Sequence, residues 1–260
     1  MKKKVCLVIG AGAGIGGHVA ARFAKAGYHS VLCRRSNKEG LDHLVHEIQR
    51  NGGTATGFIL NAVDSNSIEA CIEKVEYEIG AINTLVFNLG AQTGLKSLAE
   101  TSAKTFELSW RLATFSLFRA AASVLPYMEK RAEGNLLVTS ATAAVRGNAG
   151  QTAHTSAMAG RRMLCQALNA EYAHKGIHVA HILIDGLVDA PDTLGKIMGP
   201  AAFTKLQQTK GLKHDGLVLP SKVAETYLHL VRQHRSTWTH ELDIRSFIDI
   251  AWWNHKLADF

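Results

Sequence analysis

Short apolar runs alternate with longer amphipathic stretches along almost the whole chain. The amphipathic stretches have apolar residues at helical spacing, which predicts helices near 15–26, 38–51, 66–78, 102–130, 151–174 and 221–233. The apolar runs are rich in β-branched and aliphatic residues, which predicts strands at 4–9, 29–33, 54–60, 82–87, 134–140, 177–184 and 239–244. Strands that are apolar throughout and separated by helices are typical of a parallel sheet covered on both faces.

This alternation predicts an α/β protein with a single Rossmann-like, doubly wound sheet of about seven parallel strands and helices on both faces. Ligands bind such a sheet at the carboxyl ends of its strands. No linker, low-complexity run or internal repeat divides the chain, so residues 1–260 are expected to form one domain. The segment 186–219 breaks the alternation, being rich in small residues and weakly amphipathic. A small lid-like insertion and a plain surface excursion both fit it.

Composition adds little to the predicted fold class, but it argues against several classes of partner. The formal net charge is +7, yet the basic residues are scattered and not interleaved with aromatic ones, so we expect no nucleic-acid partner. No stretch approaches the ~20 apolar residues of a membrane span, so no membrane partner is expected either. Four widely spaced cysteines without a CxxC pair indicate reduced thiols in a cytoplasmic protein. The histidines lack the companions of a metal site, so no metal is expected.

A glycine-rich loop stands between the first predicted strand and the first predicted helix. Gly10 permits a tight turn there, and Gly14 lets the backbone approach a pyrophosphate. Gly16 allows the helix to pack closely on the strand, with the phosphates at the helix N-terminus. The loop and its flanking elements predict a dinucleotide site.

The end of the second predicted strand indicates which dinucleotide is bound. An NAD site usually has a carboxylate there for the ribose 2′-hydroxyl, but this strand ends in Arg34 and Arg35, and no carboxylate follows before Glu39. Two guanidinium groups suit a 2′-phosphate, which arginine binds through paired charge-assisted hydrogen bonds. The sequence favours NADP(H) over NAD(H). The alternative is that one of these arginines points to solvent.

With these features the chain resembles the short-chain dehydrogenase/reductase family over essentially its whole length. Phe87-Asn88-Leu89-Gly90 stands where the family has Asn-Asn-Ala-Gly, and Asp185-Gly186 stands where it has Pro-Gly. Segments 142–147, 179–181 and 236–245 are similar to a poorly characterised subgroup that often lacks the catalytic Tyr. The loop, the strand ends and the resemblance together assign the cofactor to Gly10, Gly14, Ile15, Gly16, Arg34, Arg35, Asn61, Ala62, Asn88, Gly90, Gly186 and Val188.

The resemblance also assigns catalytic positions, and the two most important hold unusual residues. In typical members a Tyr donates a proton to a carbonyl oxygen while hydride leaves the nicotinamide, and a Lys four residues later binds the nicotinamide ribose. Here these positions hold His154 and Met158. His154 is interpreted as a replacement acid, because imidazole titrates near pH 6.5, or as a neutral filler. Met158 has no donor for a ribose hydroxyl.

The remaining positions of the resemblance depart from the family as well. The Ser position is Ala141, although a slip of one residue would give that role to Ser140 or Thr142. The usual Asn and Thr positions hold Ala113 and Ala190. Two polar residues that follow the fourth and fifth predicted strands are candidates for substrate contact, namely Gln92 and Arg146.

Three functions remain open on this sequence. The first is an atypical NADP(H)-dependent oxidoreductase that reduces a carbonyl, enone or imine without the usual Ser-Tyr-Lys set. The second is a catalytically silent NADP(H)-binding subunit or sensor, and the third is a non-redox enzyme on the same fold. The resemblance further implies a small-molecule substrate and a homodimer or homotetramer formed through helices 102–130 and 151–174.

Overall fold

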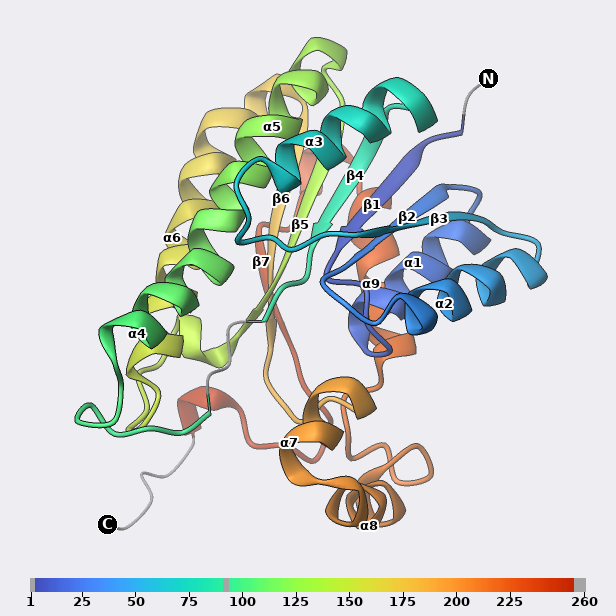
Figure 1. Cartoon of the computed structure of the whole chain (residues 1–260). Coiled ribbons are helices and arrows are strands. Elements are labelled where there is room, and N and C mark those ends of the chain that lie inside the picture. The colour runs from blue at the N-terminus through green and yellow to red at the C-terminus, as the bar shows by residue number, and fades with distance from the viewer. Residues whose placement is uncertain (1–2, 91–93, 255–260) are drawn as a thin grey trace.

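The computed structural model of the chain describes residues 3–90 and 94–254, which are built around one sheet (Figure 1). The sheet has seven strands in the order β3-β2-β1-β4-β5-β6-β7, and all neighbouring pairs are parallel. The strands are β1 (Val5–Ile9), β2 (His29–Arg34), β3 (Thr54–Ile59), β4 (Ile82–Phe87), β5 (Gly134–Ala141), β6 (Ile177–Ile184) and β7 (Glu241–Ile244). The predicted doubly wound parallel sheet is confirmed.

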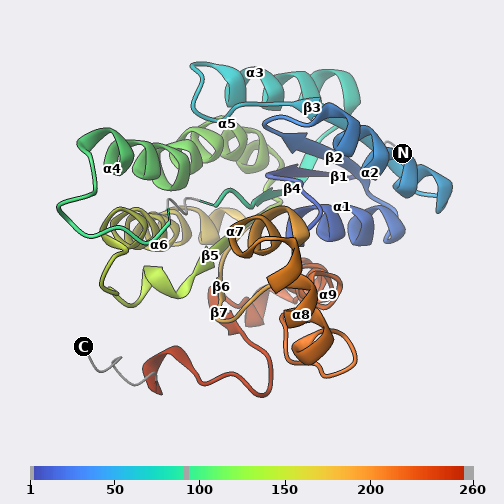
Figure 2. The same cartoon turned by 60° about the horizontal axis from the view of Figure 1, so that its bottom comes forward.

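Helices cover both faces of this sheet (Figure 2). One face carries α1 (Ile15–Lys25), α2 (Lys38–Arg50) and α9 (Pro220–Arg232). The other carries α3 (Ser67–Lys74), α4 (Ala103–Trp110), α5 (Ser116–Arg131) and α6 (Thr152–Tyr172). The helix predicted over 102–130 is interrupted by a π-helical segment, η2 (Arg111–Phe115), which separates α4 from α5. In the described part of the chain no helix is long and apolar enough to cross a membrane.

Alternate residues of β1, an interior strand, explain why the strands are apolar throughout. Val5, Leu7 and Ile9 of β1 belong to a core that includes residues of α5. Cys6 and Val8, on the opposite side of the same strand, belong to a second core that includes residues of α1 and α9. Because successive side chains of a strand point to opposite faces, a strand covered on both sides needs apolar residues at every position.

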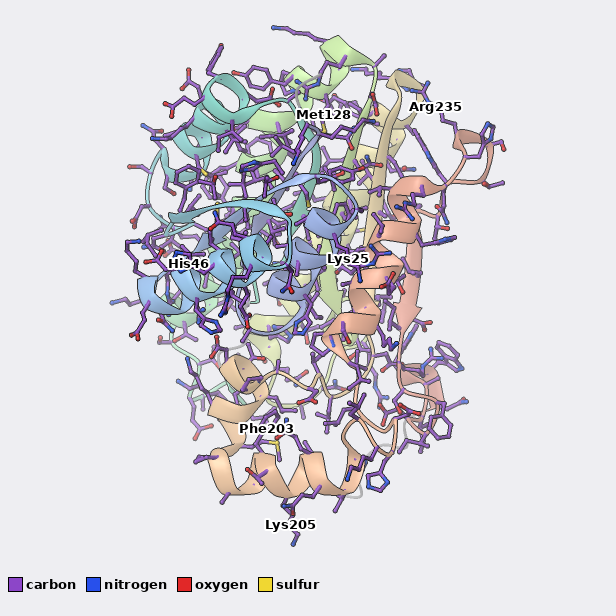
Figure 3. The ribbon with its side chains drawn as sticks, turned by 90° about the vertical axis from the view of Figure 1, so that its right-hand side faces the viewer. Lys25, His46, Met128, Phe203, Lys205 and Arg235 are labelled. Atoms are coloured by element: carbon purple, nitrogen blue, oxygen red, sulfur yellow. The ribbon has the colours of Figure 1, made fainter. Side chains whose placement is uncertain are left out.

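Two further helices lie beyond the carboxyl ends of the strands, α7 (Lys196–Met198) and α8 (Pro200–Lys210). The sequence pattern predicted no helix in this segment. Phe203 is the one buried residue of α8, so the helix has almost no apolar stripe. In Figure 3 Phe203 points from α8 toward the rest of the molecule, whereas Lys205 points away. Pro200 in the first turn of α8 was the available sequence signal for its start.

The cysteines are all free thiols in the structure, but two of them lie close together. The Sγ atoms of Cys33, at the end of β2, and Cys71, in α3, are 3.6 Å apart. These residues are 38 positions apart in the sequence, and the packing of α3 on the sheet brings them together.

Candidate cofactor and active site

A cavity of about 590 Å³ opens at the carboxyl edge of the sheet. It extends from the glycine loop after β1, past the ends of β4, β5 and β6, to the first turns of α6. The residues predicted for the cofactor or for catalysis that line it are Gly10, Gly14, Ile15, Gly16, Asn88, Gly90, Ser140, Thr142, His154, Gly186 and Val188. The structure thus brings the glycine loop and the candidate catalytic residues to one cavity.

The glycine loop is packed so tightly that side chains would not fit at two of its positions. Gly10 has a positive φ of 100°, and a Cβ atom built there would lie 2.6 Å from the carbonyl oxygen of Asn88. A Cβ atom on Gly16 would lie 2.3 Å from the carbonyl oxygen of Gly10. That same carbonyl accepts a hydrogen bond from Asn88 Nδ2 at 2.9 Å. The loop therefore presents bare backbone at the N-terminus of α1, as a cradle for a pyrophosphate requires.

Four of the residues predicted for the cofactor do not line the cavity. Arg34 forms an ion pair with Asp192, and Arg35 is exposed. Asn61 donates from Nδ2 to Asp64 Oδ1 at 2.7 Å. The fourth is Ala62, whose carbonyl accepts from Ser116 Oγ and Arg119 Nη1. Arg34 is the last residue of β2 and Arg35 follows it. Both lie beside the glycine loop, whose Gly10 and Ala11 amides donate to the carbonyl of Cys33.

The part of the cavity wall formed by α6 adjoins a small apolar cluster. Ala113, Ala157 and Met158 belong to one small buried cluster, and Met158 is 2% exposed. Ser140 Oγ lies 3.9 Å from the Met158 sulfur, a weak acceptor. His154 is buried with 5% exposure and lines the cavity beside this cluster. Within residues 3–90 and 94–254 no group of three His, Cys, Asp or Glu side chains could hold a metal ion.

Three charged residues of the cavity wall, Arg161, Asp192 and Asp249, were not identified from the sequence. Arg161 is 1% exposed and lies seven residues after His154, on the same face of α6. Its guanidinium donates to the carbonyl oxygens of Ala113 at 3.0 Å, Thr139 at 2.7 Å and Leu89 at 2.8 Å. Burial lowers the pKa of Arg161 to about 10, so the side chain remains a cation at neutral pH. The spacing from His154 was a signal that could have revealed it.

The two residues predicted to contact substrate are not in the cavity wall that the structure describes. Gln92 lies outside the described residues. Arg146 Nη1 instead donates to the carbonyl oxygen of Trp252 at 2.9 Å. Buried Asp185 accepts from the Trp252 amide and from Arg245 Nε, each at 3.0 Å. These bonds hold the C-terminal segment at the cavity, where Asp249 and Ile250 form part of its wall.

Residues 4–193 match the sequence model of the family described as short chain dehydrogenase. The match covers most of the chain, including the glycine loop, β4, β5 and α6. The chain belongs to the short-chain dehydrogenase/reductase family.

The relatives of this chain include reductases and dehydrogenases of similar length. It is 30% identical to a 3-oxoacyl-(acyl-carrier-protein) reductase of Thermotoga maritima over 242 residues, covering 93% of this chain and 96% of that one. It is 29% identical to a 7alpha-hydroxysteroid dehydrogenase of Escherichia coli, covering 85% of this chain and 88% of the relative. The crystal structure of a short-chain dehydrogenase from Rhodopseudomonas palustris superimposes with a TM-score of 0.78 at 28% identity, covering 95% of this chain and 100% of that one.

Proposed function

We propose that the protein is an NADP(H)-dependent oxidoreductase that reduces a carbonyl, enone or imine without the usual Ser-Tyr-Lys set. The observation that carries this proposal is the single cavity that contains both the glycine loop and buried His154. Family membership supports the reaction class, because the family is one of dehydrogenases. When bound, the nicotinamide would supply the hydride.

The described residues of the loop fit such a cofactor. Gly10 and Gly16 leave no room for side chains, so the backbone N–H groups at the start of α1 would bind the pyrophosphate. Apart from its chain neighbours, no atom of the described residues lies within 4 Å of the Cβ position of Gly90, which also lines the cavity. Arg34 and Arg35 at the end of β2 would bind the 2′-phosphate.

At the other end of the cavity, we assign proton transfer to His154. Its imidazole is the titratable side chain at the position where the family resemblance places the proton donor, and it borders the cavity. Ser140 and Thr142 line the same region and would orient the substrate by hydrogen bonds. A substrate that is already a cation, such as an iminium, would need the least proton transfer from the protein.

The His154→Phe variant is expected to lower kcat/KM about 10²- to 10⁴-fold for reduction of a ketone, the usual loss when a general acid is removed. Binding of NADPH should change little, because the glycine loop follows β1, whereas His154 follows β5, two strands away in the sheet. The measurements are NADPH oxidation on a panel of ketones, enones and imines, and a fluorescence titration with NADPH and NADH.

The matched control is His46→Phe, because His46 is an exposed residue of α2 (Figure 3). It makes the same chemical change away from the cavity and should retain full activity. Turnover in His154→Phe equal to that of the unmodified protein would remove His154 from the mechanism.

One observation favours a second candidate, a catalytically silent NADP(H)-binding subunit or sensor. Met158 and Ala143 line the cavity where the family has its catalytic groups, and the Ser140 hydroxyl contacts the Met158 sulfur. Such a site can hold a nucleotide without a proton relay. Tight binding of NADPH with no turnover on the whole panel would support this function over the first.

We also propose that the protein assembles as a homodimer or homotetramer through α4, α5 and α6. An exposed aromatic patch supports this, consisting of Trp110, Phe115 and Phe118, and Phe106 and Met163 of α4 and α6 are exposed as well. Trp110 stacks on Phe115 at 5.5 Å between ring centroids, and Phe115 stacks on Phe118 at 6.3 Å. Large aromatic side chains gathered on one face are typical of protein interfaces.

The Phe118→Asp variant should shift the mass in light scattering from that of an oligomer toward 28.2 kDa, the mass of one chain. A charge placed in an apolar interface is desolvated without a partner, which weakens association. Leu212→Asp is the control, since Leu212 is 69% exposed and lies outside the aromatic patch. A monomeric unmodified protein would contradict the assembly, and an oligomer unchanged by Phe118→Asp would contradict this interface.

A further inference from the structure

Asp192 reaches from the segment after β6 to the glycine loop and the end of β2. It belongs to η5 (Pro191–Gly195), a π-helical turn at the start of the inserted segment. One oxygen, Oδ2, pairs with Arg34 Nη2 and also accepts from the backbone N–H of Ala13 at 3.4 Å. A carboxylate oxygen therefore lies between a guanidinium and a backbone donor of the nucleotide loop.

Contacts on two sides hold η5 against the glycine loop. Ala190 is 2% exposed, and a Cβ atom built on Gly14 would lie 3.0 Å from the Ala190 Cβ. On the other side of η5, Phe203 of α8 packs against Gly195, where a Cβ atom would lie 3.2 Å from the ring. These two contacts fix the position of η5, and therefore of Asp192, relative to the glycine loop.

Arg34 is also fixed by its surroundings. Its Nη1 lies 2.9 Å from the Cβ position of Gly40 in the first turn of α2, so the guanidinium fills the space between α2 and η5. The Arg34 side chain is only 13% exposed and that of Asp192 is 27% exposed. An ion pair that is partly removed from water in this way keeps more of its attraction than a fully exposed one.

We propose that Asp192 is a specificity-determining residue that competes with the 2′-phosphate of NADP(H) for Arg34 and for the Ala13 N–H. The inference rests on the proposed nucleotide-binding function. A phosphate oxygen needs the same donors that the Asp192 carboxylate occupies, and two anions cannot share them without strong repulsion. A 2′-phosphate must therefore displace Asp192, whereas the 2′-hydroxyl of NAD(H) can donate to the carboxylate where it stands.

The structure also provides a place for the displaced carboxylate. Lys196 Nζ lies 3.9 Å from Asp192 Oδ1, and its side chain is 69% exposed. Asp192 can keep this partner when Arg34 turns to a phosphate. Occupation of the phosphate site would then be linked to a shift of η5, because Asp192 belongs to that turn.

The test compares Asp192→Asn with Asp189→Asn in the full-length protein. Asparagine keeps the shape of the side chain and removes its charge. Asp189 lies in the same segment but accepts from Gln207 Nε2 and makes no contact with Arg34, so its variant controls for the loss of one negative charge. The probes are adenosine 2′,5′-bisphosphate and adenosine 5′-monophosphate, titrated by calorimetry at one fixed salt concentration.

Asp192→Asn should bind the 2′,5′-bisphosphate about fivefold more tightly, the effect of releasing one ion pair worth up to about 1 kcal/mol. Affinity for the monophosphate should change less than about twofold. Asp189→Asn should behave as the unmodified protein with both probes. If Asp192→Asn bound the bisphosphate equally or more weakly but still bound the monophosphate, the role of Asp192 would be overturned and the proposed nucleotide site would stand. Failure of every protein to bind either probe would overturn the proposed nucleotide site as well.

Discussion

The Gly16→Ala variant is expected to lower the free energy of unfolding by about 3 kcal/mol and to abolish binding of NADPH. The added methyl group would lie 2.3 Å from the Gly10 carbonyl oxygen and 2.9 Å from Asn88 Nδ2. The nearest of these atoms is backbone, which cannot rotate away as the end of a long side chain can. Relief of the clash must separate α1 from the loop or break the bond from Asn88 Nδ2 to Gly10. Either change disturbs the phosphate cradle.

Gly90→Ala is the matched control for this variant. Gly90 also lines the cavity, but within residues 3–90 and 94–254 no atom beyond its chain neighbours lies within 4 Å of its Cβ position, and its φ is not positive. Its replacement should change the free energy of unfolding by less than about 0.5 kcal/mol. Urea denaturation measures stability, and a fluorescence titration measures NADPH binding. If Gly16→Ala were as stable as Gly90→Ala, the close packing of the loop described above would be incorrect.

The second large effect is expected from Arg161→Met, which should reduce the free energy of unfolding by about 2–4 kcal/mol. The guanidinium donates to carbonyls from three separate places, η2, the end of β5 and the loop after β4. Methionine fills part of the volume but leaves these carbonyls without the donor. Removal of a buried cation returns some of its desolvation cost, which is why we expect less than the sum of three lost hydrogen bonds.

Arg50→Met provides the comparison, because Arg50 is an exposed residue at the end of α2. The same substitution there should change stability by less than about 0.5 kcal/mol in urea denaturation. Arg161→Lys should be intermediate, since an ammonium keeps the charge but cannot reach three carbonyls in one plane. Equal stability of Arg161→Met and Arg50→Met would mean that the three bonds make no net contribution.

The fold could be predicted from the sequence because its signals are local. β1 carries apolar residues at every position, and the spacing of Gly10, Gly14 and Gly16 indicated a loop between strand and helix. α8 has no such local signal and was not predicted, because its burial depends almost entirely on Phe203. A helix with one buried residue has no period to detect.

Only part of the candidate site could be predicted from the sequence. His154 and Met158 share a helix face, and their spacing of four residues placed them together, whereas Arg161 on the same face was not identified. Asp192 and Arg34 are 158 positions apart, and no local pattern predicts their contact. Arg146 shows the reverse difficulty: its position after β5 suggested the substrate, whereas the packing of the C-terminal segment places it on the Trp252 carbonyl.

The wall that Asp249 and Ile250 give to the cavity lies outside residues 4–193, the part of the chain that matches the family. It is attached through Asp185 and Arg146, which hold its backbone at Trp252. In evolutionary terms the cavity has two parts that can diverge separately. Substitutions in the last residues can reshape the substrate end without disturbing the glycine loop. Relatives that share the first part can therefore differ in the substrates that they accept.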